Sequence, residues 1–193
     1  MWVTAVTPLC DTISQAQSAT SMDYVIRPAT LADIEGIRQV ARITWHATYA
    51  HCIAAHIRAR FLEQAYATHT LSDTLNQQPH WFYVATLAKQ VIGYAQYVIR
   101  YDTQWELVRL YVHPDHQRRG IGRSFLWMGA AAMLAAGADA CYASVAAENA
   151  PALAFYQRCG FRPQRRYARL LADQMIELVE LRASLADMIA TSS

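Results

Sequence analysis

Several signatures are missing from this 193-residue chain, and each absence excludes a class of protein. None of its four cysteines (10, 52, 141 and 159) forms a C-x-x-C pair, which argues against a zinc knuckle or a redox motif. No apolar run approaches the roughly 18 residues that span a bilayer. The first positive side chain after the amino terminus is Arg27, so no basic export-signal region precedes it. We therefore expect free thiols, a cytoplasmic location and no membrane partner.

Charge and glycine content exclude further functions. The formal net charge of +2 is too small to argue by itself for nucleic acid, and no nucleic-acid partner is expected. No lysine follows a glycine, which excludes the Walker phosphate loop. A dinucleotide fingerprint needs a third glycine and a place early in the chain, and the G-x-G at Gly120 and Gly122 has neither.

The patterns that are present indicate a mixed α/β protein. Hydrophobic residues make up 54% of the chain and charged residues 17%, as in globular domains. Periodicity predicts the order β-α-α-β-β-β-α-β-α-β-β. Strand 105–113, helix 120–136 and strand 140–146 form the crossover expected of a parallel pair. We expect a mostly antiparallel sheet with this central parallel pair and with helices on both faces.

The chain is expected to form one domain. Residues 1–22 carry a single charge and poor periodicity, so we predict a flexible N-terminal extension. The folded domain is expected over residues 23–183, followed by a frayed tail over 184–193. One helical stretch is predicted from Ile57 to Leu75, and Thr30-x-x-Asp33 predicts a capping box at the start of the first helix.

The stretch HPDHQRRGIGRSF, residues 113 to 125, joins a predicted strand to a predicted helix. Such a junction presents amides that the helix ladder does not use, and the helix dipole adds partial positive charge. Gly120 and Gly122 lack side chains, so a diphosphate can approach the backbone closely. These features favour a phosphate-binding loop over a solvated basic turn, with the arginines secondary to the glycines and amides.

The loop also resembles a known signature. Gln117-Arg-Arg-Gly120-Ile-Gly122 reads Q-x-x-G-x-G, which resembles the acetyl-CoA signature of the GNAT superfamily of N-acetyltransferases. ENAPALAFYQRCGF is similar to that family's later N-x-x-A-x-x-x-Y-x-x-x-G-F element, and IRPATLADIEGI resembles its N-terminal segment. The resemblance covers about residues 23–182. It implies the GNAT fold and an enzyme that uses acetyl-CoA as co-substrate.

The resemblance also implies which residues hold the cofactor. The amides of residues 118–123 would bind the pyrophosphate, Gln117 would brace the loop, and the backbone of Leu110–Val112 would pair with the pantetheine arm. The expected cofactor-binding residues are Leu110, Tyr111, Val112, Gln117, Arg118, Arg119, Gly120, Ile121, Gly122, Arg123, Ser124, Asn149 and Tyr156. Asn149 is equally suited to cap the following helix.

Two side chains are candidates for acid–base catalysis. An alkyl ammonium with a pKa near 10.4 is only about one part in 10³ neutral at pH 7, so a base is useful. Glu106 matches the place of the general base in histone-acetyltransferase members of the superfamily, and otherwise is an exposed strand-end glutamate. Tyr156 matches the family's general acid, and otherwise packs as an aromatic beside Phe155 and Phe161. Cys141 and Cys159 have no histidine placed to activate them, so direct attack in a ternary complex is expected.

The acceptor site is expected near WHATYAHC, residues 45 to 52. Trp45 and Tyr49 share one helical face, and together with Glu106 they are the predicted substrate-binding residues. Their rings can hold a cation or can fill the core. A small or polyamine-like primary amine is the favoured acceptor, and a protein N terminus or a lysine is the alternative. A homodimer is left open, and so is a second function class, a non-catalytic acyl-CoA-binding domain.

No metal site is predicted. Cys52 and His56 share the i, i+4 spacing of a helix face, with His46 and His51 nearby. They form no H-E-x-x-H arrangement and the local sequence offers no further ligand, so a structural or substrate-facing role is favoured.

Overall fold

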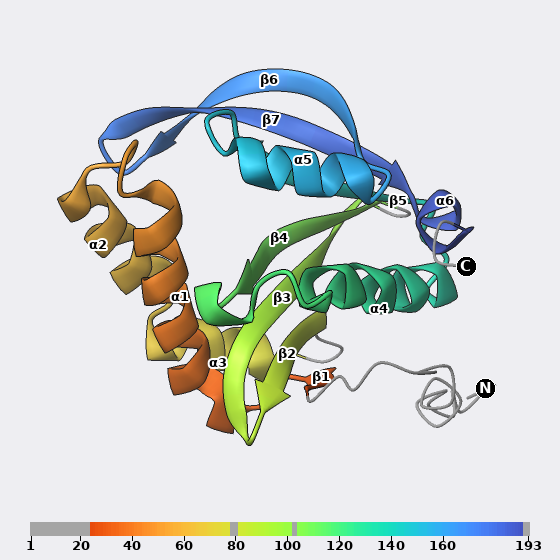
Figure 1. The fold of residues 1–193 in the computed structure, drawn as a ribbon, viewed down its shortest axis with the longest axis horizontal. Coiled ribbons are helices and arrows are strands. Elements are labelled where there is room, and N and C mark those ends of the chain that lie inside the picture. The colour runs from red at the N-terminus through yellow and green to blue at the C-terminus, as the bar shows by residue number, and fades with distance from the viewer. Residues whose placement is uncertain (1–23, 78–80, 102–103, 191–193) are drawn as a thin grey trace.

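The structure is a computed structural model and describes residues 24–77, 81–101 and 104–190. Its centre is a seven-stranded sheet in the order β1-β2-β3-β4-β5-β7-β6 (Figure 1). The strands are β1 (Val25–Pro28), β2 (Trp81–Leu87), β3 (Gln90–Tyr101), β4 (Gln104–Val112), β5 (Ala140–Ala146), β6 (Arg162–Leu171) and β7 (Gln174–Ser184). The β4–β5 pair is parallel and the other pairs are antiparallel, which confirms the predicted fold class.

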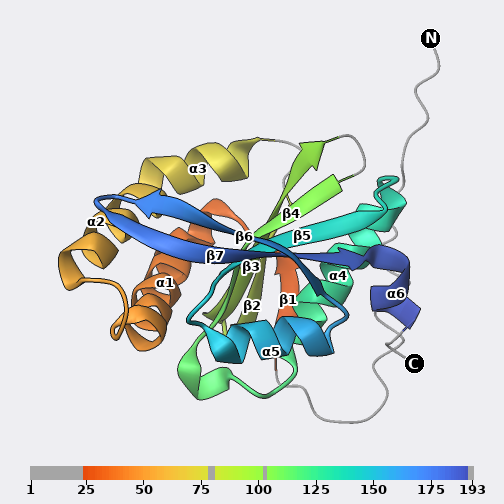
Figure 2. The same ribbon diagram turned by 90° about the horizontal axis from the view of Figure 1, so that it is seen from above.

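Helices cover both faces of this sheet. They are α1 (Ile34–Tyr49), α2 (Ala55–Ala65), α3 (Thr68–Asn76), α4 (Ile121–Ala135), α5 (Ala150–Arg158) and α6 (Leu185–Ala190), with short 3-10 turns η2 (Leu31–Asp33) and η3 (Pro114–His116). Figure 2 shows α1, α2 and α3 on one side of the sheet and α4 and α6 on the other. No helix in the described ranges is long and apolar enough to cross a membrane.

Each face has its own hydrophobic core. On one face Ile37 and Val40 of α1 pack against Phe82 and Tyr94 of the sheet. On the other face, α4, α5 and α6 pack against β3, β4, β5 and β7. The buried residues there include Phe125, Leu126, Trp105, Leu107, Cys141, Phe161 and Leu181. The two cores hold the sheet rigidly between the helix layers. Residues at the ends of its strands are therefore held in fixed positions.

The prediction of one helix over residues 57–75 is wrong, because the structure has two helices there, α2 and α3. Ala67 adopts an extended conformation (φ −57°, ψ 143°) that ends one helix and starts the next. The turn buries Tyr66, whose hydroxyl group hydrogen bonds to the Tyr94 hydroxyl at 2.9 Å. A tertiary contact therefore breaks a segment that is helical by periodicity.

The C-terminal segment also differs from its prediction. Residues 185–190 form helix α6 rather than a frayed tail, because Leu185 and Met188 are buried in the same core as α4. Residues 1–22 lie outside the described residues, so the extension and the two predicted domain boundaries stay predictions.

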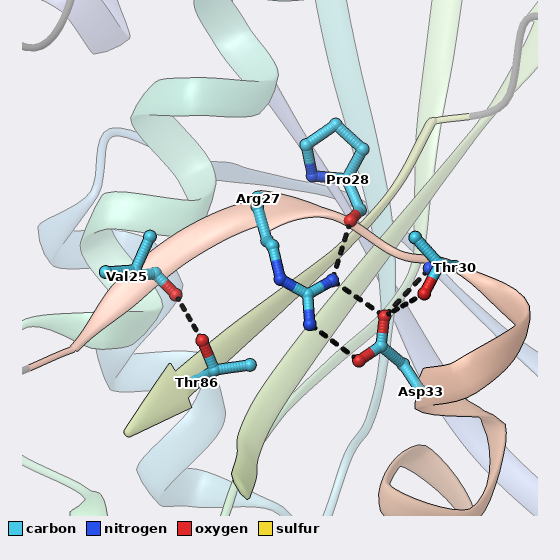
Figure 3. Close-up of polar contacts among 6 residues, drawn as sticks. All are labelled: Val25, Arg27, Pro28, Thr30, Asp33 and Thr86. Carbon is cyan, nitrogen blue, oxygen red and sulfur yellow. Dashed lines mark hydrogen bonds and ion pairs between the residues drawn. The ribbon is translucent and has the colours of Figure 1, made fainter. Parts of the chain in front are cut away.

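An ion pair fixes the start of α1 to β1. The Arg27 guanidinium donates two 2.7 Å hydrogen bonds to the Asp33 carboxylate, which also accepts from the Thr30 amide at 2.8 Å and hydroxyl at 2.9 Å (Figure 3). Burial acts to raise the pKa of Asp33, but the hydrogen bonds from Arg27 and Thr30 outweigh it and lower the pKa. The contact orients the helix whose far end carries Trp45 and Tyr49.

Candidate functional site

The sheet opens between β4 and β5. Their parallel pairing covers only Gln104 to Leu107 of β4, opposite residues 140 to 143 of β5. Val108 is an extra residue in β4, because Leu107 faces Tyr97 and Arg109 faces Gln96 on β3. Such a bulge bends and twists its strand. Beyond it, residues 108–112 have no partner on the β5 side among the described strands, and β4 diverges from β5 (Figure 1).

A tight loop follows β4 at this opening. The Gln117 side-chain amide donates to the Val112 carbonyl at 3.0 Å, which ties the loop back to the strand end. Arg118 (φ 62°) and Gly120 (φ 81°) both adopt left-handed backbone conformations. The first ladder bond of α4 runs from the Ser124 amide to the Gly120 carbonyl at 2.9 Å.

The loop leaves a row of amides unused. Within the part of the chain that the structure describes, the amides of Arg118, Arg119 and Gly120 have no acceptor, and those of Ile121 and Gly122 lie in the first turn, before the ladder begins. Because the α4 dipole points its positive end at the same place, the loop is suited to an anion. Arg118 and Arg119 are exposed at its rim.

The other predicted loop residues face neighbouring elements. The Arg123 guanidinium lies over the Trp127 ring, 4.5 Å from its centroid, and the Ser124 hydroxyl is 3.0 Å from the Tyr24 hydroxyl. A Cβ atom at Gly122 would lie 3.2 Å from Cζ of Phe155, so α4 and α5 approach closely there. A side chain at position 122 would require the Phe155 ring to shift by a few tenths of an ångström.

Three tyrosines from three elements lie close enough to influence one another's pKa. Burial raises the pKa of Tyr156 on α5, and Tyr49 at the end of α1 adds to that shift. The pKa of Tyr111 on β4 is likewise raised by burial and by Tyr49 and Tyr156. Phenols in such surroundings stay protonated and are hydrogen-bond donors. The Tyr156 ring also packs edge-on against Phe155 and Phe161, as its packing interpretation predicted.

Glu106 lies half-buried on β4, in the paired part of the strand. It faces Val98 on β3 and Tyr142 on β5. Burial raises the pKa of the nearby Cys141 thiol to about 12, and the Glu106 charge contributes. Glu106 therefore lies where the strands are still joined, just before the opening.

Asn149 caps α5 and also contacts the tyrosine group. Its side-chain oxygen accepts from the Ala152 amide at 3.1 Å, which is the cap expected from the sequence. Burial raises the pKa of Tyr49, and hydrogen bonding with Asn149 and Tyr111 partly offsets the shift. The residue thus links the start of α5 to the end of α1.

Comparison with known proteins decides the family. The sequence profile of the acetyltransferase (GNAT) family matches residues 38–161, which contain the opening, the loop and the three tyrosines. The chain belongs to the GNAT acetyltransferase family. It is therefore an acyltransferase, and the family uses acetyl-CoA as acetyl donor.

Individual relatives agree with this assignment. A spermidine N(1)-acetyltransferase of Thermoplasma acidophilum is 26% identical over 145 residues, which are 73% of this chain and 89% of the relative. The PaiA N-acetyltransferase of the same organism, solved in complex with coenzyme A, has a TM-score of 0.73 at 24% identity, covering 82% of this chain and 98% of that chain. Ard1 of Thermoplasma volcanium has a TM-score of 0.68 at 17% identity, with 84% and 98% covered. The likeness to these solved structures shows a shared fold.

In this acetyltransferase the predicted aromatic wall divides into two parts. Trp45 is only 6% exposed and stacks on Phe61 at a centroid distance of 4.2 Å, so it fills the core between α1 and α2. Tyr49 is half-buried and reaches Asn149 and Tyr111. Both rings lie beside Tyr111, because the Trp45 ring is also 6.4 Å from the Tyr111 ring, but Trp45 is the more deeply buried of the two.

Sequence reasoning missed the contact that covers the Trp45 cluster at the end of α1. The β6–β7 hairpin reaches the loop between α1 and α2 (Figure 1), where Gln174 donates to the Cys52 carbonyl at 2.8 Å. Asp173 pairs with Arg60 at 3.1 Å, and Leu171 and Ile176 pack on the Trp45 cluster. No local pattern signals a contact between segments more than 100 residues apart.

The side chains that could bind a metal do not lie together in the way that their spacing in the sequence indicates. The structure brings His51 and Cys52, in the loop after α1, together with Glu148, in the turn before α5; one ligand atom from each lies within 4.8 Å of the others. His56, which shares the i, i+4 spacing with Cys52, and the nearby His46 are not in this group. Glu148 was missed because it is distant in sequence.

Proposed function

We propose that the protein transfers an acetyl group from acetyl-CoA to the primary amine of a small molecule, by direct attack in a ternary complex. A polyamine-like acceptor is favoured over a protein N terminus or a lysine side chain. The observation that supports this most is the divergence of β4 from β5, with unused loop amides at its end and three tyrosines beside it.

The residues at the opening fit acetyl-CoA as a substrate. A pyrophosphate accepts hydrogen bonds from several amides at once, and residues 118–122 offer amides without a protein acceptor at a helix N-terminus. The pantetheine arm carries amide groups, which can pair with the free edge of β4 from Leu110 to Val112 as an added strand would. Asn149 and Tyr156 line the same opening from α5 and complete the proposed cofactor set.

Glu106 is the proposed base and Tyr156 the proposed acid. Glu106 accepts the ammonium proton, directly or through water, which removes a penalty of roughly 4–5 kcal/mol at pH 7. The amine nitrogen then bonds to the thioester carbon, while a strand amide near Leu110 or Tyr111 stabilises the oxyanion. When the C–S bond breaks, Tyr156 donates its proton to the sulfur, and the phenolate regains a proton from the nitrogen of the intermediate, which becomes the neutral amide. Burial raises the pKa of Tyr156, so the phenol is protonated before the C–S bond breaks.

The cysteines do not support a covalent route. Burial raises the pKa of Cys141 to about 12, so its thiol is protonated and a poor nucleophile at neutral pH. Burial raises the pKa of Cys159 as well. Direct attack by the acceptor amine needs no such nucleophile.

The covered acceptor side favours a small amine. The β6–β7 hairpin is bonded to the loop after α1 through Gln174 and through the Asp173–Arg60 ion pair. A polypeptide acceptor would need these segments to separate, whereas a small amine does not. The relative named as a spermidine N(1)-acetyltransferase supports the same class.

An acetylation assay over a panel of amines tests the proposal. With acetyl-CoA as donor and thiol release as readout, spermidine and simple diamines should be acetylated faster than peptides with a free N terminus or lysine. Glu106→Gln should lower kcat by about 10²–10⁴-fold near neutral pH and recover as pH rises toward the amine pKa. A variant that keeps wild-type turnover over the whole pH series would overturn the assignment of Glu106.

Ligand binding must be measured alongside. A ligand at about 100 times its Kd adds about 2.7 kcal/mol to stability, so acetyl-CoA should raise the melting temperature of wild type and Glu106→Gln equally. Stabilisation by acetyl-CoA without transfer to any amine would contradict the proposed acceptor class. Stabilisation by ATP or NAD without an effect of acetyl-CoA would contradict the proposed donor site.

A further inference from the structure

Three side chains with different ligand atoms meet at the edge of the acceptor side. His51 and Cys52 follow α1 directly, and Glu148 precedes α5. An imidazole nitrogen, the thiol sulfur and a carboxylate oxygen all lie within 4.8 Å of one another. Burial raises the pKa of the neighbouring Tyr49 and the Asn149 side chain partly offsets this shift, so Tyr49 and Asn149 lie close together across the same gap. The group therefore bridges two segments that border the proposed site.

The backbone on both sides of the group is already held. The Cys52 amide donates to the Tyr49 carbonyl at 3.3 Å, and the Cys52 carbonyl accepts from Gln174 at 2.8 Å. On the other side, the Asn149 amide donates to the Ala146 carbonyl at 2.9 Å, and the Ala150 amide donates to the Glu148 carbonyl at 3.0 Å. Binding an ion here needs little backbone ordering, because only the side chains must adjust.

The ligand types indicate which ion fits. Thiolate and imidazole are ligands of borderline-soft cations, whereas Mg²⁺ and Ca²⁺ require oxygen. Zn²⁺ takes Cys, His and Glu ligands at bond lengths of about 2.0–2.3 Å in a tetrahedron, which spaces the ligand atoms by about 3.3–3.8 Å. His51 and Glu148 are exposed and free to make the small rotations that close the gap. A water molecule would complete the four ligands that Zn²⁺ takes.

We propose that His51, Cys52 and Glu148 form a Zn²⁺ site that joins the loop after α1 to the turn before α5. The local sequence argued against a metal, because the third ligand lies far along the chain from the first two. With the Cys52 thiolate and the Glu148 carboxylate as ligands, the bound ion makes the site neutral, whereas the free site carries the negative charge of Glu148. Loss of that negative charge should weaken the attraction of a cationic acceptor. This consequence rests on the proposed amine acceptor, whereas the site itself does not.

Cobalt substitution in the full chain tests the site without using activity. The background variant is Cys10→Ser, because Cys10 lies outside the described residues and its thiol could also bind metal. One equivalent of Co²⁺ should give a cobalt–thiolate charge-transfer band and the visible bands of a tetrahedral ion, and Zn²⁺ should displace both. Absence of these bands would overturn the proposal.

Variants locate the ligands. Cys52→Ser should abolish the charge-transfer band, and His51→Ala or Glu148→Gln should weaken Zn²⁺ binding by at least about tenfold. The matched controls are Cys159→Ser, a half-buried thiol elsewhere, and His56→Ala, an exposed histidine on α2; both should bind like the background. A band that survives Cys52→Ser, or is lost in Cys159→Ser, would contradict the assignment.

Kinetics then test the consequence separately. Saturating Zn²⁺ should raise the KM for a cationic amine by about fivefold or more, and Cys52→Ser should remove this effect. If the cobalt bands appear but the KM for the cationic amine does not change, the inhibitory role is overturned and the metal site itself still stands. Cobalt bands in a protein that acetylates no amine would contradict the proposed function alone.

Discussion

The side-chain amide of Gln174 donates a 2.8 Å hydrogen bond to the main-chain carbonyl of Cys52, 122 residues earlier. The oxygen of the same side chain accepts from the Ala54 amide at 3.3 Å. One residue at the start of β7 thus satisfies a backbone donor and a backbone acceptor of the loop after α1. The β6–β7 hairpin and this loop consequently form one continuous surface, which under the proposed function is one wall of the acceptor site.

Gln174→Ala should loosen that wall. Loss of both hydrogen bonds should lower the free energy of unfolding by about 1–2 kcal/mol and raise the KM for the acceptor amine, with the KM for acetyl-CoA unchanged. Urea melts and steady-state kinetics measure the two effects. Gln164→Ala is the matched control, because that amide bonds only to the Arg162 and Pro163 carbonyls of its own strand. An unchanged acceptor KM in Gln174→Ala would remove the argument for a covered site.

Tyr156→Phe should separate chemistry from binding. The variant keeps the ring contacts with Phe155 and Phe161 but lacks the proton donor, so kcat should fall by about 10²–10⁴-fold while acetyl-CoA still stabilises the protein. Tyr142→Phe, on β5 and outside the proposed machinery, should keep wild-type turnover. Full activity of Tyr156→Phe would show that the residue only packs.

Local sequence patterns predicted the strand–loop–helix unit correctly. They did not show what surrounds each glycine of the loop. The sequence assigned Gly120 and Gly122 alike to the close approach of a phosphate. Gly120 does have the left-handed conformation that a glycine allows, in open space. Gly122 also lies against Phe155 of α5, a helix that follows later in the chain, and its predicted role at the phosphate stays a prediction. Periodicity carries no information on which helices meet.

The acceptor side was less predictable for the same reason. Helical spacing put Trp45 and Tyr49 on one face, but burial of Trp45 against Phe61 depends on where α2 folds back. The proximity of Glu148 to Cys52 depends on the β5–α5 turn reaching the end of α1. These relationships are set by tertiary packing, which overrides local spacing.

Gly120→Ala should distinguish a binding loop from an ordinary turn. Gly137 is its matched control, because both glycines have φ of 81° and open space around a new Cβ. Each substitution should cost about 1–2 kcal/mol of stability from backbone strain alone. Only Gly120→Ala should also weaken acetyl-CoA binding, measured by calorimetry, because it alone distorts the loop amides. Equal affinities in the two variants would contradict the role of the loop.

The Arg27–Asp33 pair should make stability depend on pH. Because the folded-state pKa of Asp33 is lowered, its contribution is complete above the unfolded pKa of about 4 and is lost as pH falls through the folded value. Asp33→Asn should therefore be less stable by about 1–2 kcal/mol near neutral pH, a modest figure because Arg27 is partly exposed. The difference from wild type, measured by urea melts, should shrink as the pH is lowered below about 4.

Glu35→Gln is the control for that experiment. Glu35 is exposed and pairs with Arg38 on the surface of α1 at 2.8 Å, so its loss should change stability by less than about 0.5 kcal/mol at any pH. A difference between wild type and Asp33→Asn that stays constant on acidification would mean that the asparagine disturbs packing. The ionised carboxylate would then not be what anchors α1, and the position of Tyr49 would depend on the hydrophobic core alone.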